Sequence, residues 1–566
     1  MATGRVGARR ITTGPDLASA SPQREPADFG APLAPYVACL IADVAALYFV
    51  MAFRSSLPYG VAGLYALMAD LAASHGYVLP HTIPYYGPGG IPFAYPPLAT
   101  YTQALFVHQL HVPAFSYLRV APVVFTVSAV LPLSLLFWEL SRSRLVSALG
   151  ALFTITNFIL LTWQIRADGS VRGFALLWTL TGLWLTVRAM RTRTAWQVGG
   201  AALALAATIC SHPMYPVFFL LTLCALALAG GPREEFRRRV AISGGIVVGG
   251  FLLSAVWWAM MLDRYGLTIM LNPLHSHGGL LGITTFKQPF TFLYLLFTHL
   301  GIFVFGLPPH TAQRVPHLLV THPMGVFQLL HLDLTPAPWW PEYAFSFYGL
   351  WKLTRSRQWL LPLWFVLVLV TMGEADRFLA IIVALTAAMV VRDLLAGLRR
   401  RRVTPPLRAV GLALVAGVML STLLGVTRWT FDQRAYFTLD DVRVGHWMQT
   451  HTAPSAIFLP VAQPVEAMEW YPYLFHRSPD IASWGAEWTN RFYPQIIELN
   501  AQQQCASQGS LPCFDRVLGA NHLHATYLVL SRRQRYNRLI RALHGSPRWR
   551  MVFQNRTDAV WKRSTG

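Results

Sequence analysis

The feature that most limits the fold of this chain is a series of long apolar segments joined by short, Arg-rich connections. The first segment, 35–53, approaches the ~20 apolar residues that a helix needs to cross a bilayer. In lipid, backbone N–H and C=O groups must pair within the protein, so such segments are expected to be helices. Further spans are expected at 117–140, 145–163, 171–190, 196–210, 215–230, 240–262, 343–353, 360–372, 378–391 and 407–426.

The number of spans depends on residues 290–332, which contain Pro308-Pro309 and scattered His. This region either crosses the membrane twice or lies against its outer face, so the sequence predicts an α-helical polytopic membrane protein with about 11–13 transmembrane helices. Hydrophobic residues make up 54% of the 566 and charged residues only 13%, which excludes an ordinary soluble protein.

The distribution of Arg predicts how the chain is oriented. The formal net charge of +21 would suggest nucleic acid for a soluble protein, but here most Arg lies in short connections such as 142–144, 188–193 and 233–239. Cytoplasmic loops of membrane proteins carry such an excess, so these connections are expected in the cytoplasm. Residues 1–30, rich in Arg, Ser, Thr, Pro and Gly, are expected to be a disordered cytoplasmic tail. Because successive connections alternate between the two sides of the membrane, the C-terminus is expected outside the cytoplasm. The expected location is the plasma membrane.

The long first external loop, 54–116, is expected to be shaped rather than flexible. Apolar residues recur at helical spacing over 61–74, which predicts a short helix. The following part is crowded with Pro, Gly and Tyr. Such backbone cannot lie bare in lipid, so the loop either caps the membrane domain (31–426) or lines a cavity.

Several short motifs make this chain resemble the C-type (GT-C) integral-membrane glycosyltransferases, which include dolichyl-phosphate-mannose-protein mannosyltransferase-like and aminoarabinose-transferase-like enzymes. The motifs are Gly63-Leu64-Tyr65, Ser74-His75-Gly76, Gly89-Gly90, Tyr95-Pro96-Pro97-Leu98, and Gly373-Glu374-Ala375-Asp376-Arg377-Phe378 at the start of a late span. The resemblance implies that the first external loop faces a polyprenyl-phosphate-sugar donor, and it makes Tyr95 a candidate for substrate binding. One departure concerns the catalytic acid, because the chain has Val61-Ala62 where the family usually has Asp or Glu.

The last part of the chain, 427–566, has the composition of a separate soluble domain. The apolar runs 456–461 and 525–530 predict short buried strands, and 438–447 predicts the start of a helix with Asp440 and Asp441 in its first turn. A small α/β or α+β domain outside the cytoplasm is therefore expected. There, Cys505 and Cys513 are close enough in sequence to form a disulfide.

Transfer of a sugar needs a base near the acceptor hydroxyl, and external acids are few. Asp70 lies on the expected loop helix, where it either faces the cavity or is a solvated surface residue. Asp168 lies in the second external loop between Arg166 and Arg172, which are candidate substrate-binding residues. It either acts as the base or forms a turn before Gly169 and pairs with an Arg. Asp70 and Asp168 are the predicted catalytic residues.

A second charged group, Glu374, Asp376 and Arg377, stands at the expected outer end of a late span. The forked guanidinium of Arg377 suits a donor phosphate, although the group could equally be an interfacial ion-pair cluster. The His pairs His108-x-x-His111 and His275-x-His277 lack a nearby acid or Cys set, so no metal site and no cofactor is predicted.

The leading hypothesis is a glycosyltransferase that moves a sugar from a polyprenyl-phosphate donor to an extracytoplasmic glycan, lipid or protein. The first alternative is a catalytically degenerate protein of the same architecture that binds lipid-linked glycans in envelope assembly, which Val61-Ala62 favours. The second is a transporter, which would call for internal repeats that the sequence does not display.

Overall fold

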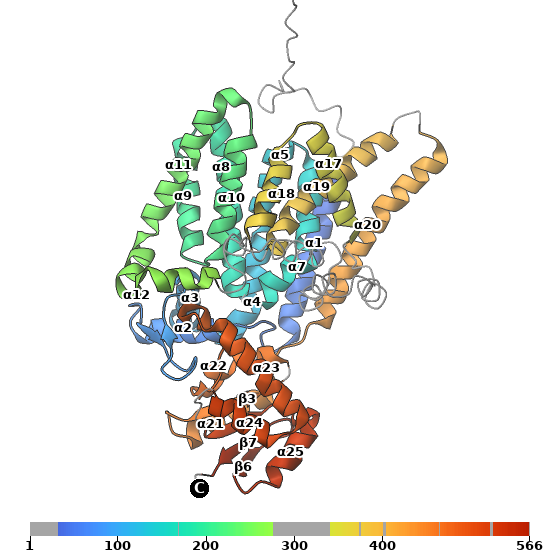
Figure 1. The fold of residues 1–566 in the computed structure, drawn as a ribbon. Helices are drawn as coiled ribbons and strands as arrows, with labels where there is room; N and C mark the ends of the chain where they lie inside the picture. The colour runs from blue at the N-terminus through green and yellow to red at the C-terminus, as the bar shows by residue number, and fades with distance from the viewer. Residues whose placement is uncertain are drawn as a thin grey trace, which may run out of the picture.

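The computed structural model describes residues 32–167, 169–275, 340–372, 375–399, 403–462, 464–520 and 525–564. Apolar helices form a bundle, and a smaller domain with a sheet lies at one end of it (Figure 1). The predicted tail 1–30 and the ambiguous region 290–332 lie outside the described residues.

The bundle and its loops contain sixteen described α-helices, in agreement with the expected helical polytopic class. They are α1 (Ala34–Arg54), α2 (Gly63–Ser74), α3 (Leu98–Ala104), α4 (Ala114–Ser128), α5 (Val130–Ser141), α6 (Arg144–Ile155), α7 (Phe158–Leu161), α8 (Gly169–Thr192), α9 (Ala195–Ile209), α10 (Met214–Ala229), α11 (Phe236–Leu253), α12 (Ala255–His275), α17 (Trp340–Arg355), α18 (Leu360–Thr371), α19 (Asp376–Leu398) and α20 (Pro405–Asp432).

Within the described ranges, five helical stretches are long and apolar enough to cross a membrane, or seven if two bent pairs each count as one span. The five are Ala34–Arg54, Ala114–Ser141, Gly169–Thr192, Arg377–Leu398 and Pro405–Asp432. Shorter apolar helices, α9, α10 and α18, lie at three further expected positions. The expected total of 11–13 stays a prediction, because residues 276–339 are not described.

The expected span 240–262 and the external loop after it are wrong in detail. The chain bends by 59° between Arg233–Leu253 and Ala255–Pro273, and α12 reaches His275 with a break at Gly266, whose φ is +74°. After the bend, buried Met261 and its neighbours Tyr265 and Ile269 pack against residues of the first loop. Arg264 donates a hydrogen bond to the carbonyl of Leu79 at 2.8 Å. The segment is thus helical on both sides of Gly266 and packs on the first loop at the end of the bundle.

The C-terminal domain is built on a five-stranded mixed sheet in the order β4-β3-β5-β7-β6. Strand β3 pairs in parallel with β4 and β5, whereas β7 pairs antiparallel with β5 and β6. The predicted strands are confirmed as β3 and β5, and the predicted helix as α21, which Thr438 and Asp441 begin with a capping box. The strands are β3 (Ile457–Val461), β4 (Ser478–Pro479), β5 (Tyr527–Leu530), β6 (Trp549–Gln554) and β7 (Ala559–Arg563), and the α-helices are α21 (Leu439–His451), α22 (Tyr471–Phe475), α23 (Phe492–Gln508), α24 (Leu511–Ala520) and α25 (Asn537–His544).

The two faces of this sheet have different partners. Leu459 and Leu528 face the core that α23, α24 and α25 cover, where Cys505 and Cys513 form the predicted disulfide with Cα atoms 5.4 Å apart. Phe458 and Tyr527 face the other way, into a cluster that also contains Leu57 and Ala62 of the first loop. The C-terminal domain is therefore joined to the bundle through a shared apolar core.

Candidate functional site

The first and second loops at this end of the bundle meet along the backbone. Val61 and Ala167 form a parallel bridge, in which the N–H of Val61 donates to the carbonyl of Arg166 at 2.9 Å. Gly60 makes the approach feasible, because a Cβ atom there would lie 2.7 Å from the same carbonyl oxygen. The bridge fixes the chain just before α2.

Glu469, the last residue of the short helix η6 (Val465–Glu469), caps the start of α2 from the C-terminal domain. Its Oε2 accepts the N–H groups of Ala62 and Gly63 at 3.0 and 2.8 Å, and its Oε1 accepts that of Leu64 at 2.7 Å. Burial raises the pKa of this carboxyl to about 7, and the three N–H donors oppose that rise. The carboxylate of Glu469, from the C-terminal domain, thus lies at Ala62, one of the two positions where the first loop has no acid.

The Tyr95-Pro96-Pro97-Leu98 motif joins the first loop to the connection between α9 and α10. The N–H of Leu98 donates to the carbonyl of Cys210 at 2.8 Å. This places the ring of Tyr95 edge-on to Tyr65, His212 and Trp488, with centroids 4.8, 6.0 and 6.0 Å away. Tyr95 is thereby held among aromatic rings from both domains.

Arg172, in the first turn of α8, supplies the cation of the site. Its Nη1 donates to the carbonyl of Ala167 at 2.7 Å, its Nε contacts Nε2 of His212 at 3.2 Å, and its guanidinium lies 4.8 Å from the ring centroid of Trp163. Nδ1 of His212 also receives the N–H of Met214 at 3.1 Å. A neutral imidazole has a single acceptor nitrogen, so only one of these two contacts with His212 is a full hydrogen bond.

The segment around η7 (Ala486–Thr489) brings the C-terminal domain over the same space. The side chain of Asn272 on α12 donates to the carbonyl of Trp488 at 2.8 Å. Gly485 has a φ of +80°, which favours glycine, and its Cα packs closely on Ile91 of the first loop. Asn272 follows both the bend after α11 and the break at Gly266, on the last part of α12, and Figure 1 shows α12 at the end of the bundle that faces the C-terminal domain.

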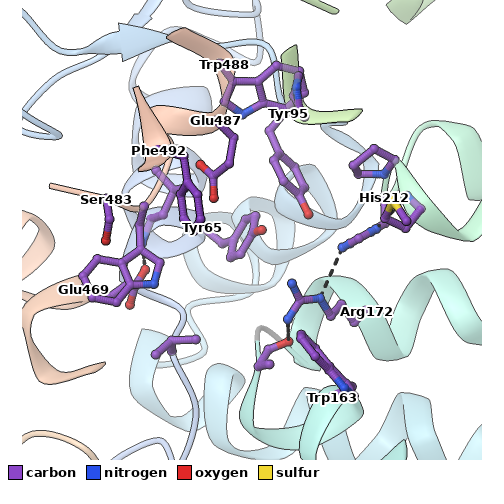
Figure 2. A pocket seen from close by; sticks show the side chains of 18 of the residues that line it. Tyr65, Tyr95, Trp163, Arg172, His212, Glu469, Ser483, Glu487, Trp488 and Phe492 are labelled. Carbon is purple, nitrogen blue, oxygen red and sulfur yellow. Dashed lines mark hydrogen bonds between the residues drawn. The ribbon is translucent and has the colours of Figure 1, made fainter. Parts of the chain in front are cut away.

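These elements enclose a cavity of about 310 Å³. Figure 2 shows Arg172 and His212 on one side and Glu469 and Glu487 on the other, with aromatic rings between them. The lining residues are Val61, Leu64, Tyr65, Tyr95, Trp163, Ala167, Arg172, His212, Pro213, Met214, Pro273, Glu469, Ser483, Trp484, Gly485, Glu487, Trp488, Phe492 and Ile496. Such a space can hold an anionic group at one end and a hydroxyl-bearing group at the other.

The structure brings together some of the predicted site residues and not others. Tyr95 and Arg172 line the cavity. Asp70 does not, and its Oδ1 instead contacts Nε2 of His108 at 2.9 Å. Arg166 stacks its guanidinium over Tyr436, 4.5 Å from the ring centroid. Asp168 lies outside the described residues, although it follows Ala167 of the lining.

The predicted cluster on the late span is only partly described. Glu374 lies outside the described residues, and Asp376 is described only as the first residue of α19. Arg377 is fully buried, and its guanidinium lies 4.5 Å from the ring centroid of Trp163. It therefore lies behind a ring of the cavity wall and is not itself part of the lining.

Sequence reasoning missed Glu469, Glu487, His212, Trp163 and Trp488. The two Glu residues read as ordinary polar residues of a soluble domain, and nothing local marks them as neighbours of the first loop. His212 had a usable signal, since it lies in a short connection beside Pro213. In the part of the chain that the structure describes, no group of three or more His, Cys, Asp or Glu side chains could hold a metal ion.

No protein-family model and no curated protein matches the sequence. Among solved structures, the Archaeoglobus fulgidus oligosaccharyltransferase in complex with Zn and sulfate has a TM-score of 0.58 at 13% identity, covering 92% of this chain and 73% of its own. The same organism's oligosaccharyltransferase AglB, in complex with an inhibitory peptide and a dolichol-phosphate, has a TM-score of 0.56 at 14% identity, covering 94% and 74%. ArnT from Cupriavidus metallidurans, bound to undecaprenyl phosphate, has a TM-score of 0.48 at 12% identity, covering 94% and 98%.

These similarities show the fold. The chain has the architecture of GT-C-type membrane glycosyltransferases, an apolar helical bundle followed by a C-terminal domain that contains a sheet. The resemblance seen in the sequence motifs is confirmed at this level.

Proposed function

We propose that this protein is a membrane glycosyltransferase that takes a sugar from a polyprenyl-phosphate donor and passes it to an acceptor outside the cytoplasm. The observation that carries the proposal is the cavity between bundle and C-terminal domain, with a cation on one wall and carboxylates on the other. The solved AglB complex with a dolichol-phosphate supports a lipid-phosphate ligand for this architecture.

The cation side suits the donor. When the bond between sugar and phosphate breaks, negative charge grows on the phosphate, and a fixed guanidinium stabilises that charge. Arg172 is held for this role by Ala167 and Trp163. Arg377, behind Trp163, adds positive charge to the same wall.

The remaining predicted residues keep proposed roles. Asp168 stays a candidate base from the sequence, whereas Asp70 does not line the cavity. Arg166, which is stacked on Tyr436, stays a proposed substrate-binding residue, and so do Glu374 and Asp376. Tyr95 offers its ring to the sugar.

A degenerate, binding-only protein remains the second candidate. The observation that favours it is that the first loop has Val61-Ala62 and no acid directly before α2, where Glu469 of the other domain accepts three N–H groups.

The test is an assay of the purified full chain in lipid nanodiscs with a panel of radiolabelled polyprenyl-phosphate sugars. Turnover is the expected result, whereas binding without turnover would select the degenerate protein. Accumulation of labelled sugar inside liposomes would select a transporter.

The donor side has its own control. Arg172→Ala should weaken donor binding about 10- to 100-fold, as loss of a charged hydrogen bond costs ~1.5–3 kcal/mol. Arg188→Ala, near the other end of α8 and stacked on Trp184, should leave donor binding within about two-fold. Equal effects of both changes would contradict the assignment of Arg172.

A further inference from the structure

The described lining of the cavity contains two acids, Glu469 and Glu487, and both come from the C-terminal domain. Glu469 is committed to the start of α2. A carboxylate has about four lone-pair directions, and three of those of Glu469 already receive backbone N–H groups. The role of Glu469 is therefore to join the C-terminal domain to the first loop.

Glu487 is held in a different way. Its segment is fixed by neighbours on both sides, with Gly485 against Ile91 and the carbonyl of Trp488 bonded to Asn272. Trp488 itself is buried, and its ring lies 6.0 Å from that of Tyr95. These contacts set the backbone of Glu487, and Figure 2 shows its carboxylate directed into the cavity towards Tyr65 and Tyr95.

The positions of Glu487 and Arg172 fit a displacement reaction, in which the attacking and leaving groups lie on opposite sides of the anomeric carbon. In such a reaction the acceptor oxygen enters on the face of the sugar opposite to the leaving phosphate, so base and phosphate-binding cation belong on opposite walls. Arg172 lies on α8 of the bundle, and Glu487 lies across the cavity on η7 of the C-terminal domain (Figure 2). Ala167 lies on the same side as the cation, because its carbonyl accepts a hydrogen bond from Arg172.

We propose that Glu487 is the catalytic base of sugar transfer and that the acceptor therefore binds against the C-terminal domain, between Trp484 and Trp488. An oxygen of Glu487 takes the proton of the acceptor hydroxyl while the hydroxyl oxygen bonds to the anomeric carbon. The bond from that carbon to the phosphate oxygen breaks, and its electron pair stays on the phosphate beside Arg172. Glu487 then returns its proton to water. This inference rests on the proposed function.

The experiment compares Glu487→Gln with the parent in the nanodisc assay, using the donor that the parent turns over. Gln keeps the size of the side chain and removes the base, so turnover should fall about 10²–10⁴-fold while donor binding stays within a few-fold. Glu487→Asp, with its carboxylate set back by one methylene, should keep an intermediate rate. The matched control is Glu466→Gln, since Glu466 lies on η6 of the same domain and outside the cavity lining.

A second readout separates catalysis from folding. Glu487→Gln should lose kcat, while its KM for the donor and its melting temperature stay close to those of the parent. Glu487→Gln turnover within a few-fold of the parent, with Asp168→Asn inactive, would overturn the proposal and leave the function intact. A parent that turns over no donor in the panel would overturn both.

Discussion

At the scale of single residues, the site depends on contacts that no local pattern encodes. Glu469 contacts the N–H of Leu64 across 405 positions of sequence, and Trp470 beside it donates to the carbonyl of Gly60 at 3.0 Å. Tyr95 was predicted from the family resemblance of its motif, and Arg172 from its place near Asp168 in the second external loop. The sequence could not predict Glu469 or Glu487, since an acid in a polar domain is ordinary unless its partner is known.

The buried carboxyl of Glu469 predicts a pH dependence of stability. Its pKa is about 7 in the folded protein and near 4.3 when unfolded, so between these values the folded chain keeps a proton that the unfolded chain has lost. Raising the pH from about 4.3 to 7 should lower the stability of the parent relative to Glu469→Gln by roughly 3 kcal/mol. The test is the melting temperature of both proteins across this pH range. If the parent instead became more stable than Glu469→Gln as the pH rises, the N–H donors would lower the pKa of Glu469 more than burial raises it.

At the scale of elements, the sequence predicted those helices and strands whose apolar residues are buried in only one kind of environment, either lipid or the core of one domain. Helix α2 begins two residues after the expected Val61, because that residue pairs with Ala167. Helix α12 was not predicted beyond 262, since its apolar face is buried by the first loop and not by lipid. In a helix that packs on a protein surface and in a helix that crosses a membrane, apolar residues can recur at the same spacing. The sequence therefore does not distinguish the two, and the structure does.

The η7 segment supplies a prediction about an element. Gly485→Ala places a Cβ at a φ of +80° and against Ile91, which should cost about 1–2 kcal/mol and shift Glu487. We expect a lower melting temperature together with a reduced kcat. Gly519→Ala is the control, because that glycine lies on the exposed face of α24 with nothing within 4 Å of a new Cβ. Full activity of Gly485→Ala would show that the segment does not position the base.

At the scale of the whole molecule, the Arg-rich connections gather at one end of the bundle. Glu139 binds both Arg142 and Arg191, at 2.7 and 3.0 Å, and so joins the α5–α6 and α8–α9 connections. Glu235 contacts Arg193 of the second connection at 3.7 Å. The alternation of basic and other connections predicted this arrangement, although the described residues do not reveal which end faces the cytoplasm.

We expect the basic end in the cytoplasm and the C-terminal domain outside, where its disulfide would be maintained. A reporter that works only in the cytoplasm, fused after residue 566, should be silent, and the same reporter inserted in the connection near Arg193 should be active. Strong signal from the C-terminal fusion would reverse the orientation and place the cavity on the cytoplasmic side.

The most direct test of the account is where the donor binds. A polyprenyl-phosphate sugar carrying a photoreactive group on its sugar, crosslinked to the full chain in nanodiscs, should label peptides that contain 163–172 and 483–492, the two walls of the cavity. Arg172→Ala should reduce this labelling, and unlabelled donor should compete it away. Labelling confined to lipid-facing helices such as α20, unchanged by Arg172→Ala, would contradict the assignment of this cavity as the site of sugar transfer.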